Sequence, residues 1–519
     1  MENNDVFVLV AMLLYVLVIL GIGFFYTRRS NSSPDEYFLG GRKLGPWVAA
    51  MSAEASDMSG WLLMGLPGVA YFFGASDAVW TAVGLALGTY LNWRFVAKLL
   101  RKYSEKVGAI TIPDFFSNRF HDKKKILMTV ASLLILVFFS IYVGSCFVTT
   151  GKLFNALFGW PYFTMMVIGG VFVFLYTLLG GFLAESVSDL LQGCVMILSL
   201  VIILIGGVAM AGGVENVVAF VQSIPGFGSL TQMANPILDA NETQVVVAGA
   251  PQFASPTEYG IITIISTMAW GLGYFGMPQV LLRFMAIRST KDIGRSRRIA
   301  TTWCVVSLFS AVAIGLVGRT LLPADLLTST SAETIFISLS TLLMPAFLAG
   351  IMMSGILAAT MSSSDSYMLI ASSAIAKNLF AGLFKKDATD RQILMVARLV
   401  MVAILLFGIF VAADENSSIF QVVAYAWAGF GAAFGPLMLC SLFWRRTNLA
   451  GAMAGMISGG AMVFIWRNLI KPLGGVFGIY ELLPAFIVGL AVLVAVSLLT
   501  KPPTPEVLED FDTYRQLDV

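Results

Sequence analysis

Residues 52–60 have the sequence SAEASDMSG and interrupt an apolar segment that extends from residue 47 to residue 74. A second interruption, WGLGYFGMP at residues 270–278, lies within an apolar segment from residue 259 to residue 287. The first brings two carboxylates and several hydroxyls among apolar residues, and the second brings three glycines and a proline. Both compositions favour local unwinding of a helix. In a membrane, irregular backbone is tolerated only where protein or a cavity satisfies its polar groups.

The composition indicates that most of the chain lies in a lipid bilayer. Of 519 residues, 58% are hydrophobic and 12% are charged, whereas soluble globular chains contain about 25% charged residues. Apolar runs of 18 or more residues recur from Val6–Phe25 to Leu482–Leu499, and a helix of that length crosses most of a ~30 Å hydrocarbon core. The first run follows Glu2 and Asp5 instead of a basic segment, so we expect a retained helix rather than a signal peptide.

The apolar pattern predicts an all-α membrane protein with about 13 transmembrane helices in one membrane domain over residues 1–519. The expected helices cover residues 6–26, 47–74, 78–99, 126–156, 162–181, 186–211, 259–287, 297–320, 333–375, 393–412, 417–442, 449–467 and 482–500. The longest connection runs from Gly212 to Glu258. No segment is therefore left for a separate catalytic domain.

The distribution of charge predicts the orientation in the membrane. Lys and Arg gather in alternate connections, whereas residues 212–258 contain neither. Because basic connections face the cytoplasm, we expect a multi-pass plasma membrane protein with its N-terminus outside and residues 501–519 as a cytoplasmic tail. The net charge of +2 suggests neither a nucleic acid nor an acidic partner.

The reactive side chains do not form a pattern typical of an enzyme. His121 is the only histidine and lies in a basic loop, which excludes histidine-based zinc or triad chemistry. The four cysteines lie within apolar segments at wide spacings, so we expect small core residues rather than disulfide partners or metal ligands. We therefore expect a carrier without covalent chemistry and without a prosthetic group.

Two interrupted helices, five helices apart, are typical of transporters that are built from inverted repeats. We expect residues 47–211 to form one repeat and residues 259–442 the other, with the binding site between them. Residues 6–26 would then be an additional N-terminal helix, and residues 449–500 would be two additional C-terminal helices.

Asp57 places a carboxylate inside an apolar segment, flanked by Ser56 and Ser59. Because a carboxylate within a membrane is costly unless it is paired, hydrated or neutralised, its first interpretation is functional. The structural alternative is an ion pair with a loop arginine near the interface. For Glu54, three residues earlier, a structural salt bridge and a functional role both remain open.

Residues 359–366, ATMSSSDS, place several hydroxyls in another expected helix. Ala359 and Ser363 share one helix face, as do Ser362 and Ser366. Hydroxyl oxygens suit a hard cation such as Na+, together with backbone carbonyls of an unwound partner. The alternative is that small residues allow tight packing of helices.

Further carboxylates lie near these hydroxyls or at another expected helix start. Asp365 lies one turn from Ser362. We predict that it forms a second cation-binding or proton-sensitive position together with Asp189 and Ser366. Asp189 belongs to the segment GGFLAESVSD at residues 180–189, for which helix N-capping is the structural alternative.

The segments ASDMSGWLLMGLPG at residues 55–68 and MAWGLGYFG at residues 268–276 resemble the sodium/proline symporters of the solute:sodium symporter family. The likeness covers nearly the whole chain, including EYFLGGR at residues 36–42. The resemblance implies the leucine-transporter fold with one added N-terminal helix. It also implies sodium-coupled uptake of L-proline by alternating access, with Na+ as the coupling ion.

The resemblance also implies the residues of two sites. Sodium would be bound by backbone carbonyls and hydroxyls of Ala55, Met58, Ala359, Ser362 and Ser363, with support from Asp57. Proline would be bound by Tyr142, Trp270, Tyr274 and Pro278, with Ser59, Trp61 and Gly65 nearby. Asp365 stands where similar symporters often have a small or hydroxyl residue, so the sodium stoichiometry cannot be transferred from them.

Several alternatives remain open from the sequence. The solute that is transported together with sodium could be a different amino acid, a carboxylate or a sugar instead of L-proline. In each case the carrier would be embedded in the lipid bilayer. A sodium-dependent sensor would bind its ligand without transport, but no signalling domain is recognisable. A channel is disfavoured because broken helices fit an occluded site better than a continuous pore. The sequence leaves the oligomeric state undetermined.

Overall fold

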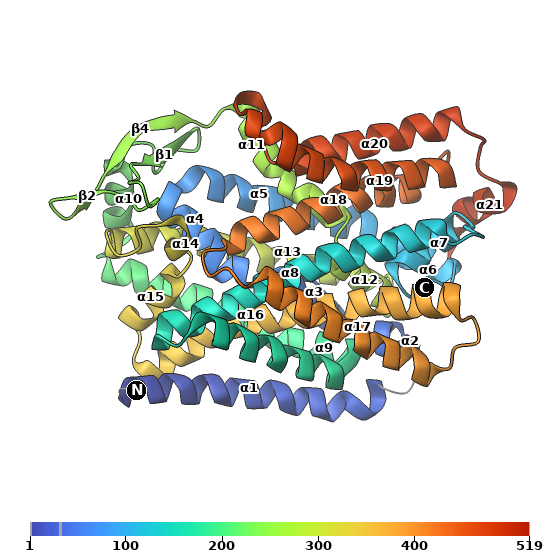
Figure 1. The fold of residues 1–519 in the computed structure, drawn as a ribbon, viewed down its shortest axis with the longest axis horizontal. Coiled ribbons are helices and arrows are strands. Elements are labelled where there is room, and N and C mark those ends of the chain that lie inside the picture. The colour runs from blue at the N-terminus through green and yellow to red at the C-terminus, as the bar shows by residue number, and fades with distance from the viewer. Residues whose placement is uncertain (1–2, 31–33, 518–519) are drawn as a thin grey trace.

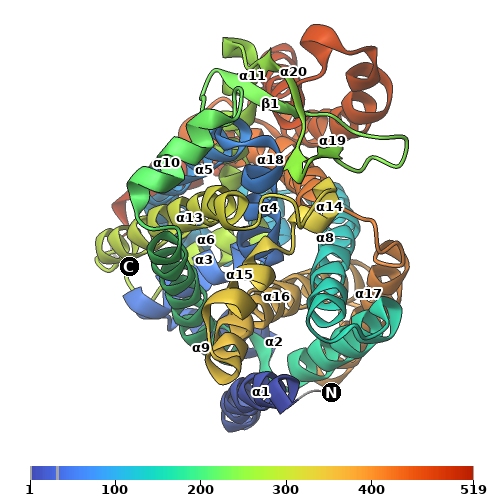
Figure 2. The ribbon, with the colours of Figure 1, turned by 90° about the vertical axis from the view of Figure 1, so that its left-hand side faces the viewer.

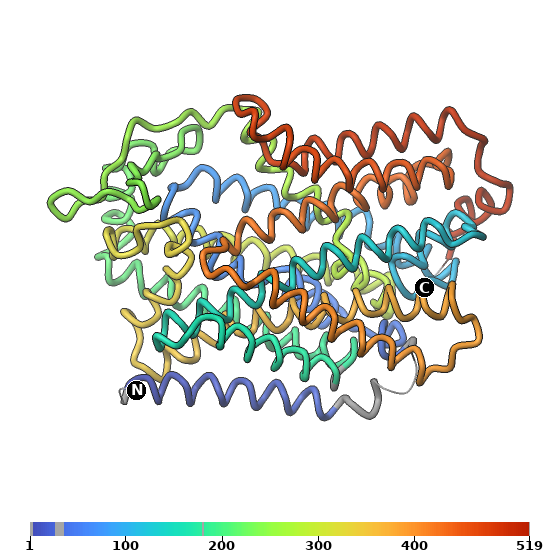
Figure 3. The backbone as a smooth tube through the Cα atoms, in the orientation of Figure 1, coloured from blue at the N-terminus to red at the C-terminus, as the bar shows by residue number. Residues whose placement is uncertain are grey.

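The computed structural model describes residues 3–30 and 34–517. Most of the long helices run roughly along one axis and pack side by side (Figure 1). In a view along that axis, α1 lies at one edge of the bundle and the short strands lie near the opposite edge (Figure 2). The two ends of the chain lie toward opposite ends of the axis (Figure 3). The prediction of a helical membrane protein is confirmed.

The elements have the following bounds in the described part of the chain. The α-helices are α1 (Asn3–Ser30), α2 (Pro34–Leu39), α3 (Pro46–Asp57), α4 (Leu66–Phe73), α5 (Ala75–Leu91), α6 (Ala97–Lys106), α7 (Ile112–Arg119), α8 (Ile126–Phe158), α9 (Tyr162–Met210), α10 (Val214–Ser223), α11 (Ile261–Met268), α12 (Pro278–Ala286), α13 (Ile293–Leu321), α14 (Ser329–Ala332), α15 (Ile335–Leu343), α16 (Ala346–Ser373), α17 (Asp390–Val411), α18 (Ile419–Phe443), α19 (Leu449–Ile465), α20 (Leu482–Leu499) and α21 (Pro505–Thr513). The π- and 3₁₀-helical turns are η1 (Gly40–Arg42), η2 (Trp61–Gly65), η3 (Asn92–Val96), η4 (Ala269–Phe275), η5 (Ala374–Phe384), η6 (Trp466–Ile470), η7 (Lys471–Leu473), η8 (Gly475–Phe477) and η9 (Tyr514–Gln516). The strands are β1 (Gln232–Pro236), β2 (Val246–Val247), β3 (Ala250–Pro251) and β4 (Phe253–Glu258).

Nine helices among the described residues are long and apolar enough to cross a bilayer, and the bent pair of α11 and α12 would bring the number to ten. Two shorter apolar helices, Trp61–Phe73 and Tyr162–Leu178, fall below that length. The predicted number of about 13 transmembrane helices therefore stays a prediction.

The first predicted interruption is a break between α3 and α4. The helix α3 ends at Asp57 because Met58 takes a non-helical backbone conformation with φ −83° and ψ 75°. The π-helical turn η2 follows. Pro67 follows η2 in the continuous helix Trp61–Phe73, and its missing N–H removes one hydrogen bond of that helix. The prediction of local unwinding is confirmed here.

The second predicted interruption is also a break. The 3₁₀ turn η4 follows α11, and the chain bends by 42° before α12 begins at Pro278. Gly271 lies so close to α5 that a Cβ atom there would be 2.1 Å from the carbonyl oxygen of Gly84. Glycine therefore permits the close approach of the broken helix to α5.

The structure corrects one of the expected segments and adds detail to two others. Residues 333–375 do not form one helix, because Pro345 separates α15 from α16 and lacks the N–H that would continue the first of them. The expected boundary between the segments 162–181 and 186–211 is present as a non-helical kink at Gly181 (φ 63°, ψ 177°), although both segments lie within α9. The long connection 212–258 contains α10 and two antiparallel strand pairs, β1–β4 and β2–β3.

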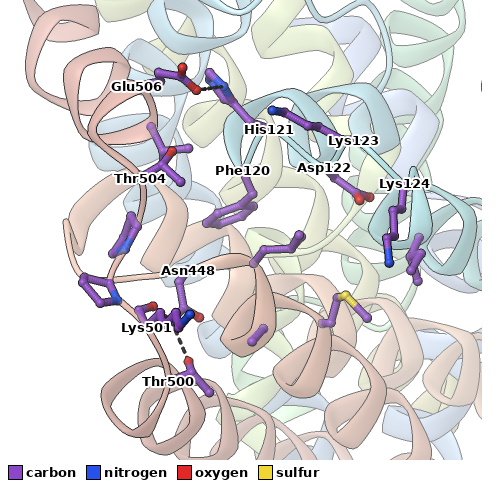
Figure 4. A pocket seen from close by; sticks show the side chains of 17 residues that line it. Phe120, His121, Asp122, Lys123, Lys124, Asn448, Thr500, Lys501, Thr504 and Glu506 are labelled. Carbon is purple, nitrogen blue, oxygen red and sulfur yellow. Dashed lines mark hydrogen bonds and ion pairs between the residues drawn. The ribbon is translucent and has the colours of Figure 1, made fainter.

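The helix α21 folds back onto the basic connection between α7 and α8. Nε2 of His121 lies 2.9 Å from Oδ2 of Asp510, and its Nδ1 lies 3.7 Å from Oε2 of Glu506. Figure 4 shows His121 and Glu506 beside a cavity of about 610 Å³ that residues 500–504 also line. The tail of residues 501–519 is thus packed against the helix bundle as far as residue 517.

Candidate functional site

The carboxylate of Asp57 connects the two broken helices. It is fully buried, and its oxygens accept hydrogen bonds from the hydroxyl of Tyr274 (2.8 Å) and from Nε2 of Gln279 (3.3 Å). Tyr274 lies in η4, and Gln279 lies in the first turn of α12. Among the described residues Asp57 has no ionic partner, so the structure does not support the alternative of a loop arginine.

The carbonyl oxygen of Ala55 meets two hydroxyls of α16. Oγ of Ser362 donates to it over 2.8 Å and Oγ of Ser363 over 3.4 Å. The Ser362 hydroxyl also lies 3.3 Å from the carbonyl oxygen of Ala359. Met58 ends α3 three residues after Ala55, and its ψ of 75° turns its carbonyl out of the helical direction. The structure therefore brings most of the expected sodium ligands to one contact between α3 and α16.

Trp270 lies at the centre of an aromatic group. Its ring centroid is 6.1 Å from that of Trp61, 5.3 Å from Phe420, 5.9 Å from Trp427 and 5.1 Å from Tyr480. Nε1 of Trp427 also donates to the Trp270 carbonyl oxygen over 2.8 Å. The group joins both helix breaks to α18 and to the connection between α19 and α20.

Tyr142 approaches the first break from α8. Its hydroxyl lies 3.5 Å from the carbonyl oxygen of Asp57, and Nε1 of Trp61 donates to the same oxygen over 3.3 Å. Ser59, between Asp57 and Trp61 in the chain, is buried. The ring of Tyr142 packs against Tyr367 of α16 with a centroid separation of 4.4 Å. Tyr142 and Trp61 therefore meet at the end of α3.

Gly65 and Pro278 lie at the margins of this region. A Cβ atom at Gly65 would lie 3.2 Å from Cβ of Phe420, so this glycine allows η2 to pack on α18. Pro278 is buried and precedes Gln279, which binds Asp57. Both residues therefore shape the backbone around the aromatic group rather than supply polar contacts.

Arg283 of α12 lies at the centre of a buried polar cluster between α3, α9 and α16. Its guanidinium donates to Glu185, to Asp189 over 3.3 Å and to Oγ of Ser366 over 2.9 Å. Its Nε donates to Oγ of Ser52 (2.9 Å), which donates in turn to Asp189 (2.7 Å). Asp189 lies in the interior of α9, so the alternative of N-capping does not hold.

Asp365 lies beside this cluster on α16. Its Oδ1 accepts a hydrogen bond from the backbone N–H of Ser366 over 2.7 Å, whereas Oδ2 has no hydrogen-bond partner within residues 34–517. Glu185 and Asp189 thus pair with one guanidinium, and the buried carboxyl group of Asp365 lies beside them without an ion pair among the described residues. Because unpaired buried charge is costly, this arrangement favours the binding of an added proton or cation.

The site also contains residues that the sequence pattern did not indicate, among them Gln279, Arg283, Trp427 and Tyr480. The sequence could have indicated Arg283, because a basic residue within an apolar segment needs a buried partner. The sequence could not have indicated the two aromatic residues, since aromatic side chains are common in membrane helices. Glu54, whose role was left open, accepts a hydrogen bond from Nε1 of Trp93 over 3.4 Å.

Residues 37–459 match the model of the sodium:solute symporter family. The high-affinity proline transporter PutP of Bacillus subtilis (strain 168) is 42% identical over 496 residues, which cover 95% of this chain and 98% of that protein. The sodium/proline symporter of Staphylococcus aureus (strain USA300) is 38% identical over 522 residues, with coverages of 99% and 96%.

Solved structures of transporters have the same fold. A Na+-coupled sialic acid symporter in a substrate-bound, outward-open state matches with a TM-score of 0.76 at 20% identity, over 96% of this chain and 99% of that chain. Mhp1, a nucleobase-cation-symport-1 family transporter, matches with a TM-score of 0.53 at 12% identity, over 92% and 98%. At these identities the likeness concerns the fold alone.

Proposed function

Because the chain belongs to the sodium:solute symporter family, we propose that it couples the uptake of L-proline to the movement of sodium ions. The protein is a multi-pass transporter of the plasma membrane with a leucine-transporter-type fold, and it is not an enzyme. The observation that carries the proposal is the meeting of Ser362 and Ser363 with the carbonyl oxygen of Ala55.

The proposed sodium site lies between α3 and α16. A hydroxyl group carries one hydrogen and two acceptor lone pairs, so Ser362 and Ser363 can turn their hydrogens away and offer oxygen atoms to an ion. The carbonyl oxygens of Ala55, Met58 and Ala359 would complete a set of oxygen ligands, which hard cations prefer. Oγ of Ser362 in α16 lies 2.8 Å from the carbonyl oxygen of Ala55 in α3. This short distance supports the proposal, because a small ion needs oxygen ligands from both helices.

The proposed proline site uses the aromatic group and the second break. Proline is a zwitterion with an apolar ring and a secondary ammonium group, so a fitting pocket needs aromatic walls and a few polar groups. Trp61, Tyr142, Trp270 and Tyr274 would supply the walls. An aromatic face near the ammonium would contribute about 0.5–2 kcal/mol. Backbone amides at the break before Pro278 could bind the carboxylate, and Ser59 and Gly65 would lie nearby.

Asp57 offers a physical connection between the two proposed sites. It follows Ala55 by two residues, and it accepts the hydroxyl hydrogen of Tyr274 in η4. A sodium ion that draws α3 toward α16 would therefore also fix the position of η4. If each solute favours the conformation that binds the other, the two affinities rise by the same factor, and the sodium gradient drives proline uptake.

A second cation position is proposed at Asp189, Asp365 and Ser366. The excess of carboxyl groups over the single guanidinium of Arg283 supports it. Asp365 would supply an oxygen ligand, because its Oδ2 has no hydrogen-bond partner among the described residues. A proton on the same carboxyl group would satisfy the cluster equally well, so the position could respond to pH.

The proposed orientation places the N-terminus outside and the tail of residues 501–519 in the cytoplasm. Two observations support it: the basic connections lie on the side of α21, and the two ends of the chain lie toward opposite ends of the molecule (Figure 3). Labelling of Asn241→Cys by an impermeant maleimide on intact cells, without labelling of Thr504→Cys, is the expected result. The reverse pattern would contradict the orientation.

Radiolabelled proline uptake into proteoliposomes tests the proposed function. We expect uptake when a sodium gradient is directed inward, and loss of uptake when potassium replaces sodium on both sides. A counterflow panel of unlabelled amino acids, carboxylates and sugars should show that proline exchanges best. Sodium-dependent proline binding without uptake would identify a sensor instead, and preferred exchange of another solute would replace proline as the substrate.

A further inference from the structure

The connection between α19 and α20 covers the ring of Trp270. It contains η6, η7 and η8 and ends at Glu481, next to α11 and far in sequence from both helix breaks (Figure 1). Tyr480 stacks on Trp270 with a centroid separation of 5.1 Å and an angle of 22° between the ring planes. Trp61 contacts the same Trp270 ring at 6.1 Å. The indole of Trp270 therefore has neighbours from the first break and from the C-terminal helix pair.

Tyr480 is fixed to two different helices. Its hydroxyl donates to the carbonyl oxygen of Ala424 in α18 over 2.6 Å. Its backbone N–H donates to Oγ of Ser266 in α11 over 2.8 Å. Because α11 continues directly into η4, which carries Trp270, the second hydrogen bond joins the connection to the broken helix itself.

A buried carboxylate links the end of this connection to its start. Glu481 is 1% exposed, and its oxygens accept hydrogen bonds from Arg467 (3.1 Å) and Lys471 (3.0 Å). Both cations are about one third exposed, at 33% and 38%. They lie along a cavity of about 540 Å³ that Trp270 and Tyr480 also line.

The cavity lies at the end of the molecule that carries the strands. Met233 of β1 lines it together with Tyr259, which follows β4. Under the proposed orientation this end faces outward, so the cavity lies on the outer side of Trp270, which lines it. Trp270 itself is only 3% exposed, because Tyr480 and its other ring neighbours cover it.

We propose that Tyr480 is a substrate-positioning residue: it closes over the outer face of Trp270 and holds that indole against bound proline. The inference rests on the proposed function. The connection of residues 466–481 moves away from η4 to admit proline, as one unit that the ion pairs of Glu481 hold together, and the hydrogen bonds of Tyr480 to Ser266 and Ala424 reform when it closes. The two helices outside the inverted repeats would thereby take part in substrate binding.

Substitution of Tyr480 tests the proposal in sodium-driven proline uptake. Tyr480→Ala removes the stacked ring, and we expect the KM for proline to rise about tenfold, as the loss of a well-placed aromatic pair predicts. The kcat and the sodium concentration for half-maximal uptake should change less than about twofold, because the Ala55 contact is untouched. Tyr480→Phe keeps the ring and loses only the bond to Ala424, so the KM should rise only about two- to threefold.

Phe477→Ala is the matched control, because Phe477 is an exposed aromatic of the same connection whose ring contacts Trp466. It should keep the parental KM. An unchanged KM in Tyr480→Ala, or an equal rise in Phe477→Ala, would overturn the proposal. If Tyr480→Ala does not reach the membrane, the KM of Tyr480→Leu for proline is measured instead, and an unchanged KM would again overturn the proposal. Failure of the parent to take up proline would instead overturn the proposed function.

Discussion

Ser362 and Ser363 differ from their neighbour Ser364 in the direction of their hydroxyls. The first two donate to the Ala55 carbonyl oxygen of another helix, whereas Ser364 donates to Thr360 within α16. We expect Ser362→Ala and Ser363→Ala each to raise the sodium concentration for half-maximal proline uptake about tenfold or more, since each removes one ion ligand. Ser364→Ala should leave that concentration unchanged. Parental sodium dependence in both of the first two variants would move the ion to another position.

Trp270 and Tyr274 lie in the same turn but make different contacts. The Trp270 ring packs against aromatic neighbours, whereas the Tyr274 hydroxyl donates to Asp57. We expect Trp270→Ala to raise the KM for proline at least about tenfold while surface expression holds. Tyr274→Ala should do the same, because it removes a second wall of the pocket.

Tyr274→Phe separates the two contributions of that residue. It keeps the ring and removes the hydrogen bond to Asp57, so we expect the sodium requirement to rise more than the KM for proline. Uptake measured over a matrix of sodium and proline concentrations distinguishes these effects. Near-normal proline affinity in both alanine variants would place the pocket away from η4.

Residues differ in how far their roles could be predicted from the sequence. Asp57, Ser362 and Ser363 stand out in the sequence because polar groups within apolar segments require an explanation. Tyr480 does not stand out, since its role depends on a contact with Trp270 across 210 residues of sequence. Arg283 was visible in the sequence, but its acidic partners on α9 follow only from the packing of three helices.

The helix breaks were predictable at the scale of the element because glycine, proline and clustered hydroxyls act locally. The break at Pro345 had the same local cause and was nevertheless missed, since the residues around it remain apolar. The strands of residues 232–258 were missed for a different reason. Strand pairs this short depend on the turn and on the helices beneath them rather than on a long alternating pattern.

The docking of α21 has a buried part and an exposed part. Phe511 is 7% exposed and lies 5.0 Å below the guanidinium of Arg119, whereas Asp512 and Arg445 form an exposed pair at 2.8 Å. Hydrogen bonding from Arg445 lowers the pKa of Asp512 below its ordinary value, so this contact is present at neutral pH and is lost as the pH falls through that lowered pKa.

These parts predict unequal effects on the stability of the docked tail. Phe511→Ala should reduce amide-exchange protection of residues 505–513 about 100-fold, because truncating a buried aromatic costs about 3 kcal/mol. Asp512→Asn should reduce it no more than about fivefold, as expected for an exposed ion pair. Hydrogen exchange of the purified protein at neutral pH measures both. Equal protection in the two variants would mean that the buried ring does not hold α21.

At the scale of the whole molecule, the proposed cycle moves charge across the membrane. Proline is a neutral zwitterion, so the charge carried per proline equals the number of cations that accompany it. One charge across 100 mV corresponds to ~2.3 kcal/mol, which supports an accumulation of about 50-fold at equal sodium concentrations. Two charges would support an accumulation of about 2,500-fold.

This difference makes the number of cations measurable. We expect the logarithm of the proline accumulation to rise with the potassium-diffusion potential with the slope of two charges. Asp365→Asn should reduce the slope to that of one charge, because it removes the carboxylate of the proposed second position while Ala55, Ser362 and Ser363 remain. An added pH gradient should change the accumulation only if the second cation is a proton. A slope of one charge in the parent that Asp365→Asn leaves unchanged would show that the carboxylates around Arg283 do not bind a transported cation.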